Sequence, residues 1–309
     1  MKRYIAILIA AVLAVPAMFA QTTQEQFAQR YGVLVKNVGV SGVGVQTLLD
    51  KWEAAFPEDP EMFTARFFYD YSKCQGNTIV SRSESRYLGQ EPVMALKDSL
   101  GVPVNYFAVT TFDDTLFGSA LKWLDKGIQA LPERLDLRFY RVSALVAYEK
   151  DSPDMACSDL RGLIDYNYTQ KPKWVYPGLE KVDNEVFATT VQEYCVTFFR
   201  YASPACYEAF KAISEKMLSY ESGNPLFMDN MGSYYLVYAK DNKKALSWYN
   251  KVLKKHPDDL TAISNCIVLA RTSKNVKLEK KYLPMLIKYS EDENTVNAAK
   301  IRLEYLQKK

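Results

Sequence analysis

The chain has 309 residues, of which 48% are hydrophobic, 24% are charged and 13% are aromatic. This composition excludes a disordered chain, which would have fewer aromatic residues and a larger net charge than the +3 found here. The glycines and prolines, 13 of each, are too few for collagen or for a low-complexity linker protein.

The first twenty residues have the pattern of a secretory signal peptide. Two basic residues precede the apolar stretch 4–15, which is too short to span a bilayer as a helix. We expect cleavage after Ala20, or alternatively after Ala17, and export of the mature chain to the periplasm or beyond. No later stretch reaches 18 consecutive apolar residues, so no transmembrane segment is predicted after cleavage of 1–20.

Charge is distributed unevenly along the mature chain. Residues 240–309 contain 16 basic and 8 acidic residues, a net charge of +8, whereas 21–239 carry a net charge of −7. The basic end either meets an acidic partner or a membrane surface, or forms the lysine-rich solvated face of the last helices. The acidic residues that interrupt the basic run favour the solvated face. We expect no nucleic-acid partner.

The part of the chain before the main repeats divides into two segments. Residues 21–75 are predicted to form N-terminal helices, and 76–118 interrupt the helical pattern. Within this insertion, 93–97 and 102–107 flank a turn at 98–101, which predicts a small β-hairpin. The insertion either has a function, as many long loops do, or covers the open end of the helical stack.

From 119 to 309 the apolar residues recur at helical spacing in paired blocks, which indicates consecutive helix pairs. In the second helix of a pair, a small residue is followed four positions later by a large apolar residue and then, three positions later, by another apolar or small one. The sets are Ala120, Leu124 and Gly127; Ala156, Leu160 and Leu163; Cys206, Phe210 and Ile213; Ala245, Tyr249 and Val252; and, as a weaker match, Val45, Leu49 and Trp52. The small residue lets the two helices approach, and the bulky residues fill the gap to the next pair.

This spacing resembles the tetratricopeptide-repeat family, whose unit of about 34 residues carries a small and then a large residue at this spacing in its second helix. The best unit, 226–257, has Gly232 and Tyr235 at the family's Gly and Tyr positions, and Asp229 where the family has Trp. The resemblance implies an all-α fold, a right-handed α-solenoid of helix pairs with the small β-hairpin insertion. The chain is also similar to exported, uncharacterised repeat proteins of Gram-negative gut bacteria.

The resemblance also implies candidate binding residues. In some family members an Asn at the sixth position of the first helix faces the concave groove and binds a peptide backbone, because an amide offers both a donor and an acceptor. Asn230 and Asn265 occupy this position in successive units, and Arg138 and Gln192 occupy it in earlier ones. The alternative is that these are ordinary polar residues that face solvent.

The sequence contains no set of residues that predicts catalysis. The single histidine, His256, lies at a predicted helix end, where a cation is favoured by the helix dipole. No metal-binding or nucleotide-binding motif occurs, so we expect no enzyme, no cofactor and no metal site. A hydrolase that uses loop carboxylates of 76–118 or 167–180 is the least favoured hypothesis.

The five cysteines are predicted to be small core residues. They are Cys74, Cys157, Cys195, Cys206 and Cys266. Their number is odd and no CxxC pair occurs. A Cys195–Cys206 disulfide across a helix hairpin is the alternative, although packed helix axes about 8–10 Å apart are usually too distant for one.

The sequence therefore predicts a non-enzymatic scaffold that binds a protein or peptide on its concave face. The alternative is a glycan-binding accessory protein of the cell envelope, similar in spirit to SusD-like proteins. In that case Tyr234, Tyr235 and Tyr238 would line a sugar-binding groove. The helical spacing of these tyrosines favours a role in the core instead. Ser99 and Thr115 lie in Asp-Ser-Leu and Asp-Thr-Leu, which resemble O-glycosylation sites of exported proteins in some gut bacteria.

Overall fold

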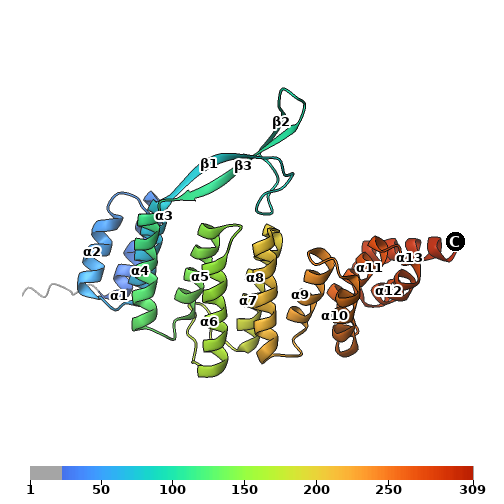
Figure 1. Cartoon of the computed structure of the whole chain (residues 1–309). Helices are drawn as coiled ribbons and strands as arrows, with labels where there is room; N and C mark the ends of the chain where they lie inside the picture. Colours follow the sequence, from blue (N-terminus) through green and yellow to red (C-terminus); the bar gives the residue numbers. More distant parts are fainter. Residues whose placement is uncertain (1–22, 309) are drawn as a thin grey trace, which may run out of the picture.

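The computed structural model describes residues 23–308, so the predicted signal peptide lies outside the described residues. In this range thirteen helices form a row beside a three-stranded sheet (Figure 1). The helices are α1 (Gln24–Val38), α2 (Val45–Ala55), α3 (Pro60–Cys74), α4 (Asp114–Ala130), α5 (Leu135–Glu149), α6 (Asp154–Gln170), α7 (Asn184–Tyr201), α8 (Pro204–Tyr220), α9 (Pro225–Val237), α10 (Asn242–Lys255), α11 (Leu260–Thr272), α12 (Val276–Tyr289) and α13 (Glu293–Gln307). None of them combines the length and the apolar character needed to cross a membrane.

The predicted fold class is confirmed: the described chain is a helical solenoid of tandem pairs that carries a small sheet. Neighbouring helices pack as α3–α4, α5–α6, α7–α8, α9–α10 and α11–α12, and α13 ends the row (Figure 1). Short polar residues begin most of these helices, and their side chains accept hydrogen bonds from backbone N–H groups of the first turn. These caps are Thr23, Asp59, Asp113, Asp183, Ser203, Asn224, Asp241, Asp259, Asn275 and Asp292.

The repeat spacing read from the sequence identifies the core of each helix pair. The small residues Ala120, Ala156, Cys206 and Ala245 are completely buried in α4, α6, α8 and α10. The large residues four positions later are also buried, namely Leu124, Leu160, Phe210 and Tyr249. In α12 the same spacing continues with Glu279 and Leu283, both buried. A charged residue therefore takes the small position in the last pair.

The insertion forms an arm, defined here as residues 75–112. Its strands are β1 (Gln75–Arg82), β2 (Met94–Lys97) and β3 (Pro103–Phe112), paired antiparallel in the order β1-β3-β2. The predicted hairpin is confirmed as β2 and β3. The carboxylate of Asp98 holds their turn by accepting hydrogen bonds from the backbone N–H groups of Leu100 and Val102, each at 2.9 Å.

The predicted boundaries of the insertion need correction. Strand β1 was not predicted, because its residues are mostly polar and, with Val80 as the one exception, exposed. It follows α3 directly, so the insertion begins at Gln75. Helix α4 begins at Asp114 instead of Ser119, because the Asp113 side chain caps it by accepting a hydrogen bond from Leu116 N at 2.9 Å.

The arm extends from the α3–α4 junction across the ends of the following helices, and the loop between β1 and β2 bends back toward the α7–α8 turn (Figure 1). Gly89 in this loop lies against Arg200 at the end of α7. A Cβ atom on Gly89 would be 2.4 Å from the Arg200 Cγ. Because Gly89 also has a φ of +72°, glycine is required here for both conformation and space.

The cysteines have the predicted structural role. All five thiols are free, and four of them are buried, with Cys157 half-buried. The alternative Cys195–Cys206 disulfide is therefore wrong, and burial raises the pKa of both thiols. His256 is exposed and ends α10, as its position in the sequence predicted.

Candidate functional site

The structure brings two of the four predicted binding residues together. Asn230 in α9 and Gln192 in α7 form a reciprocal amide pair, in which Asn230 Nδ2 donates to Gln192 Oε1 at 2.6 Å and Gln192 Nε2 donates to Asn230 Oδ1 at 2.9 Å. The second Asn230 amide proton is directed to the Ser214 hydroxyl in α8 at 3.1 Å. The pair therefore connects three consecutive helices.

This arrangement corrects the role expected for Asn230. Its side chain is 5% exposed, and its amide oxygen and both amide protons are used within the protein. Asn230 is thus a helix-packing residue and does not present a free amide to a ligand. Asn265, at the equivalent position of α11, is half-buried, and its binding role stays a prediction.

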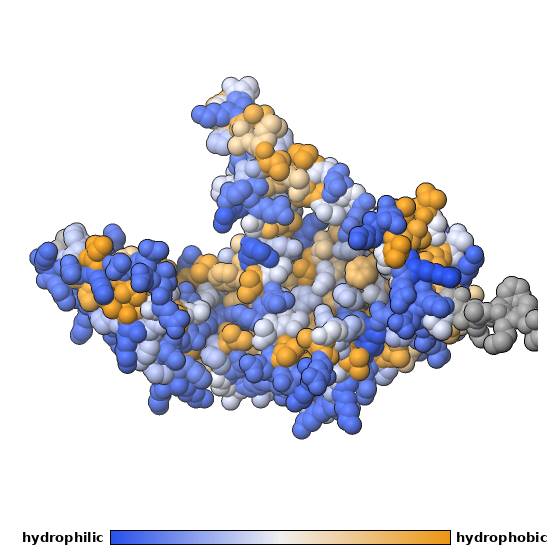
Figure 2. Space-filling model, turned by 180° about the vertical axis from the view of Figure 1, so that it is seen from behind, coloured by the Kyte–Doolittle hydropathy of each residue, from blue (hydrophilic) through white to orange (hydrophobic). Residues whose placement is uncertain are grey.

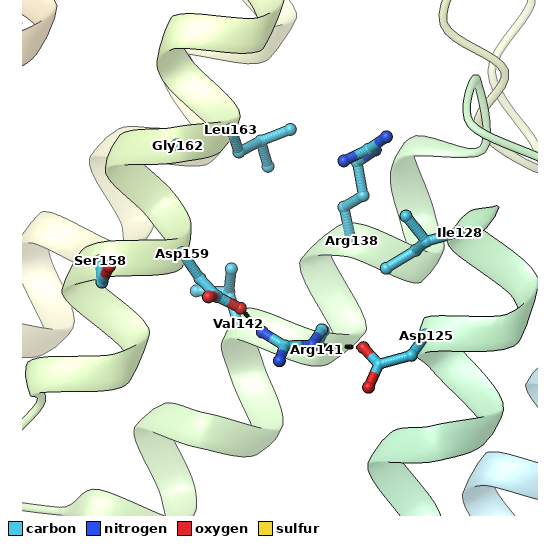
Figure 3. A pocket seen from close by; sticks show the side chains of 9 residues that line it. All are labelled: Asp125, Ile128, Arg138, Arg141, Val142, Ser158, Asp159, Gly162 and Leu163. Carbon is cyan, nitrogen blue, oxygen red and sulfur yellow. Dashed lines mark hydrogen bonds and ion pairs between the residues drawn. The ribbon is translucent and has the colours of Figure 1, made fainter.

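A groove with a volume of about 380 Å³ opens between α4 and α6, beside α5 (Figure 3). Arg141 from α5 spans it, donating to Asp125 of α4 at 2.8 Å and pairing with Asp159 of α6. One guanidinium is therefore flanked by two carboxylates. The remaining lining residues are Ile128, Arg138, Val142, Ser158, Gly162 and Leu163.

Arg138 is the one predicted binding residue that lines this groove. Its guanidinium carbon lies 4.6 Å and 5.6 Å from the ring centroids of Tyr166 and Trp174, and it donates to the carbonyl of Pro132. Within residues 23–308 no carboxylate forms an ion pair with it, and burial lowers the pKa of the guanidinium. Arg138 is thus a half-buried cation without a counter-charge within the described chain, whereas the other charges of the groove, Asp125, Arg141 and Asp159, are paired with one another.

The outer face of the arm carries a second candidate surface, which is apolar. The strand register places Ile79 beside Ala108, and Leu96 beside Val104, on the same face of the sheet, because directly paired residues share a face. Met94, paired with Tyr106, lies between them. Ile79, Met94 and Leu96 are 56%, 48% and 49% exposed.

The inner face of the arm is covered around Phe107 and is open at the hairpin end, where Lys97 and Pro103 are exposed. Tyr87 of the loop between β1 and β2 packs on Phe107, with ring centroids 5.8 Å apart, and Phe107 is almost completely buried. Asn105, on the same face, donates to the Glu84 carbonyl at 2.9 Å. The loop thus supplies a small core on one side of the sheet only. Hydrophobic side chains remain visible along the arm, which projects from the body of the molecule (Figure 2).

The apolar face was not identified from the sequence. Met94 and Leu96 are separated by the small residue Ala95 and followed by Lys97, a short alternation typical of a half-buried strand. That alternation predicts which side chains share a face, but it does not show whether the loop covers that face or the opposite one. Strand β1, which the sequence does not predict, contributes Ile79, so one of the three exposed apolar residues of this surface has no signal in the sequence.

The predicted glycosylation sites and the aromatic set occupy different environments. Ser99 lies in the β2–β3 turn and Thr115 in the first turn of α4, and both are exposed, so their modification stays a prediction. Tyr234 is buried and donates to Glu208, while Tyr235 and Tyr238 pack against the core. The core interpretation of the three tyrosines is therefore favoured over a sugar-binding groove.

No family is identified for this chain by similarity to known proteins. No family model matches the sequence, and no curated protein matches it. Among solved structures, a flexible tandem repeat domain from bacterial cellulose synthase is similar over 93% of this chain and 98% of that chain, with 16% sequence identity and a TM-score of 0.27.

Within residues 23–308 no group of three or more His, Cys, Asp and Glu side chains is placed to hold a metal ion.

Proposed function

We propose that this protein is an exported, non-enzymatic scaffold that binds a protein or peptide partner. Its functional analogues would be the exported tetratricopeptide-like proteins that its sequence resembles. The observation that carries this proposal is the apolar outer face of the arm. Soluble proteins rarely leave a contiguous apolar patch open to water, and larger patches with polar surroundings mark interaction surfaces.

The charges of the arm favour a polypeptide over a membrane as the occupant. Residues 75–112 contain three basic side chains and three acidic ones, so the arm has no net charge. Segments that lie in a membrane interface are typically rich in Lys and Arg, which attract anionic lipids. A neutral apolar sheet face instead matches the apolar centre of a protein interface, from which charged residues are depleted.

The groove between α4 and α6 supplies a second contact for the same partner. Arg138 offers a cation that no acidic residue of the described chain neutralises. Arg141 is already balanced by Asp125 and Asp159. A partner that places a carboxylate beside Arg138 would gain a charge-assisted hydrogen bond. This groove takes the place of the asparagine-lined groove expected from the sequence.

The test compares two variants of the tagged full chain, produced in the cell that makes the protein. In M94S/L96S the outer face of the arm becomes polar, whereas Lys97→Ser alters an exposed side chain on the opposite face of the same strand. After chemical cross-linking in the cell, we expect a polypeptide to co-purify at a constant ratio with the wild type and with K97S. The ratio should fall roughly tenfold or more in M94S/L96S, because burial of each side chain contributes about 1.5–3 kcal/mol when complete.

Equal recovery with M94S/L96S and the wild type would contradict the proposal. Recovery of cross-linked lipid in place of polypeptide would also contradict it. Arg138→Gln tests the groove separately, and we expect it to weaken recovery without abolishing it.

A further inference from the structure

A second cavity, next to the groove, lies where α6 ends and α7 begins. Its volume is about 280 Å³, slightly below the usual range for small-molecule pockets. The lining residues are Asn167, Tyr168, Lys171, Pro172, Trp174, Val182 and Asn184. They combine two aromatic rings, two side-chain amides and one cation, and none of them is acidic.

Asn167 lines this cavity and carries an unsatisfied hydrogen-bond donor. Its side chain is 5% exposed, and its Oδ1 accepts a hydrogen bond from the Trp174 indole at 2.8 Å. Because an indole N–H can only donate, the amide must turn its oxygen toward Trp174, which fixes the position of Nδ2. That nitrogen is buried and has no acceptor within residues 23–308. A buried donor without an acceptor costs about 1–3 kcal/mol, so the site favours a molecule that supplies one.

The surroundings define the chemistry of that molecule. Lys171 ends α6 in the left-handed conformation, with a φ of 50°, and provides the only charge among the lining side chains. The Tyr168 hydroxyl is not available, because it donates to Glu221 at 2.6 Å. The cavity therefore offers donors and a positive charge but no acid, next to the apolar surfaces of Trp174 and Pro172. A ligand must bring acceptor oxygens, together with a ring face that can pack on an indole.

We propose that this cavity binds an acidic monosaccharide unit, a sugar ring that carries a carboxylate. The carboxylate accepts hydrogen bonds from Asn167 Nδ2 and from the Lys171 ammonium group. The C–H face of the sugar ring packs on Trp174. Charge-assisted hydrogen bonds of this type are roughly twice as strong as those between neutral groups, which gives the site its preference for an acid over a neutral sugar.

The site is independent of the polypeptide-binding proposal. It lies beside the loop between α6 and α7, and none of its lining residues belongs to the arm. The cavity does adjoin the groove, because the Arg138 guanidinium carbon lies 5.6 Å from the Trp174 ring centroid, so the variants of the arm and of Asn167 are the ones that separate the two proposals. M94S/L96S should therefore leave sugar binding unchanged, and a variant of Asn167 should leave the recovery of the polypeptide partner unchanged. The two proposals can fail separately.

The experiment titrates the full chain separately with D-glucuronic acid, D-glucose and acetate. Binding is measured by calorimetry and by the shifts of the indole ¹H–¹⁵N resonances. The chain has four tryptophans, and Trp174→Phe assigns the resonance of interest. We expect glucuronic acid to bind saturably and to shift the Trp174 resonance. Glucose lacks the charge and acetate lacks the ring, so the affinity of each should be lower than that of glucuronic acid by roughly tenfold or more.

Asn167→Asp is the decisive variant, because an aspartate keeps an acceptor for the Trp174 indole but removes the donor and repels a carboxylate. It should weaken glucuronic acid binding by roughly tenfold or more. Ser158→Ala, in the groove, is the matched control and should have no effect. Equal binding by N167D and the wild type would overturn the proposal, as would equal binding of glucose or acetate. A Trp174 resonance that no probe shifts would mean that water alone fills the cavity, which also overturns it.

Discussion

Asn230 and Gln192 exchange two hydrogen bonds, and this amide pair connects α7 to α9 across α8. The two residues are 38 positions apart, about one repeat, and they occupy equivalent positions in their units. The position that the sequence assigned to ligand binding is thus used here to hold successive repeats together.

Removal of the amide pair should destabilise the solenoid. We expect Asn230→Ala to lower the free energy of unfolding by about 1–3 kcal/mol, because it removes both partners of the Gln192 amide and the donor to the Ser214 hydroxyl, which keeps only its own hydrogen bond to the Phe210 carbonyl. Gln192→Ala should cost less, because Gln192 is half-buried and water can replace it. Urea denaturation of both single variants and of the double variant measures the coupling. Additive effects would contradict a direct interaction, since residues in one hydrogen-bond network couple by about 0.5–3 kcal/mol.

A buried carboxyl group makes the stability of the C-terminal repeats depend on pH. Asp229 in α9 lies beside Asp259, the cap of α11, and its Oδ1 has no hydrogen-bond partner. Burial, together with the nearby carboxylate, raises the pKa of Asp229 to about 8. The unfolded chain has a pKa of about 3.9 for this group, so the folded state binds the proton more tightly. The stability that this proton provides is complete below about pH 4 and is lost as the pH rises to about 8.

We therefore expect Asp229→Asn to flatten the pH dependence of unfolding. The wild type should lose stability between pH 5 and pH 9, measured as a falling midpoint of urea denaturation, whereas D229N should lose much less. Asp125→Asn, in the groove, serves as a control that changes a partly exposed carboxylate. If the wild type and D229N show parallel profiles, Asp229 is not the group that titrates.

Glu279 links the last helix to the solenoid. It is buried at the small-residue position of α12, and it accepts hydrogen bonds from Arg271 at 2.7 Å and from Arg302 of α13 at 2.8 and 2.9 Å. The hydrogen bonds from Arg302 in particular lower the pKa of this carboxyl group. Its contribution to stability is therefore present above its unfolded pKa of about 4.3 and is lost as the pH falls through the lower folded value.

Glu279→Gln should weaken the attachment of α13 by about 1–3 kcal/mol, because charge-assisted hydrogen bonds are replaced by neutral ones. Hydrogen exchange of the α13 amides should become faster while exchange in α5–α8 stays unchanged. Equal protection of α13 in the variant and the wild type would show that apolar packing alone holds this helix.

The docking of the arm on α7 depends on Gly89. Gly89 and Gly101 both have positive φ values, +72° and +80°, so an alanine at either position costs about 1–2 kcal/mol of backbone strain. Only at Gly89 would the new Cβ also collide with Arg200, whereas at Gly101 nothing lies within 4 Å. We expect G89A, but not G101A, to release the loop at 83–92. Tryptic cleavage after Arg86 should be faster in G89A, and equal rates in the two variants would contradict docking at this point.

The core of the solenoid could be predicted from the sequence because burial and helical period coincide there. Ala120, Ala156 and Ala245 recur at positions that only close helix packing explains, and all three are buried. The hairpin turn could also be predicted, because Asp98 and Gly101 are typical turn residues.

The candidate sites could not be predicted in the same way, because they depend on contacts between distant segments. The period of α9 places Asn230 on a face of its helix, but it does not show that Gln192 pairs with it. The free donor of Asn167 exists only because the loop after α6 returns Trp174 to its oxygen. Strand β1 has little apolar pattern, since its partner β3, and not its own burial, determines its structure.

The most direct test of the binding role is site-specific photo-cross-linking on strand β2 in the cell that produces the protein. A photo-reactive side chain is placed at Leu96, on the open apolar face, and in a second protein at Lys97, which is exposed on the opposite face of the strand and so controls for proximity alone. The scaffold proposal predicts one discrete adduct with another polypeptide from position 96 and little or none from position 97. Adducts of equal yield from both positions, or none from position 96, would contradict it.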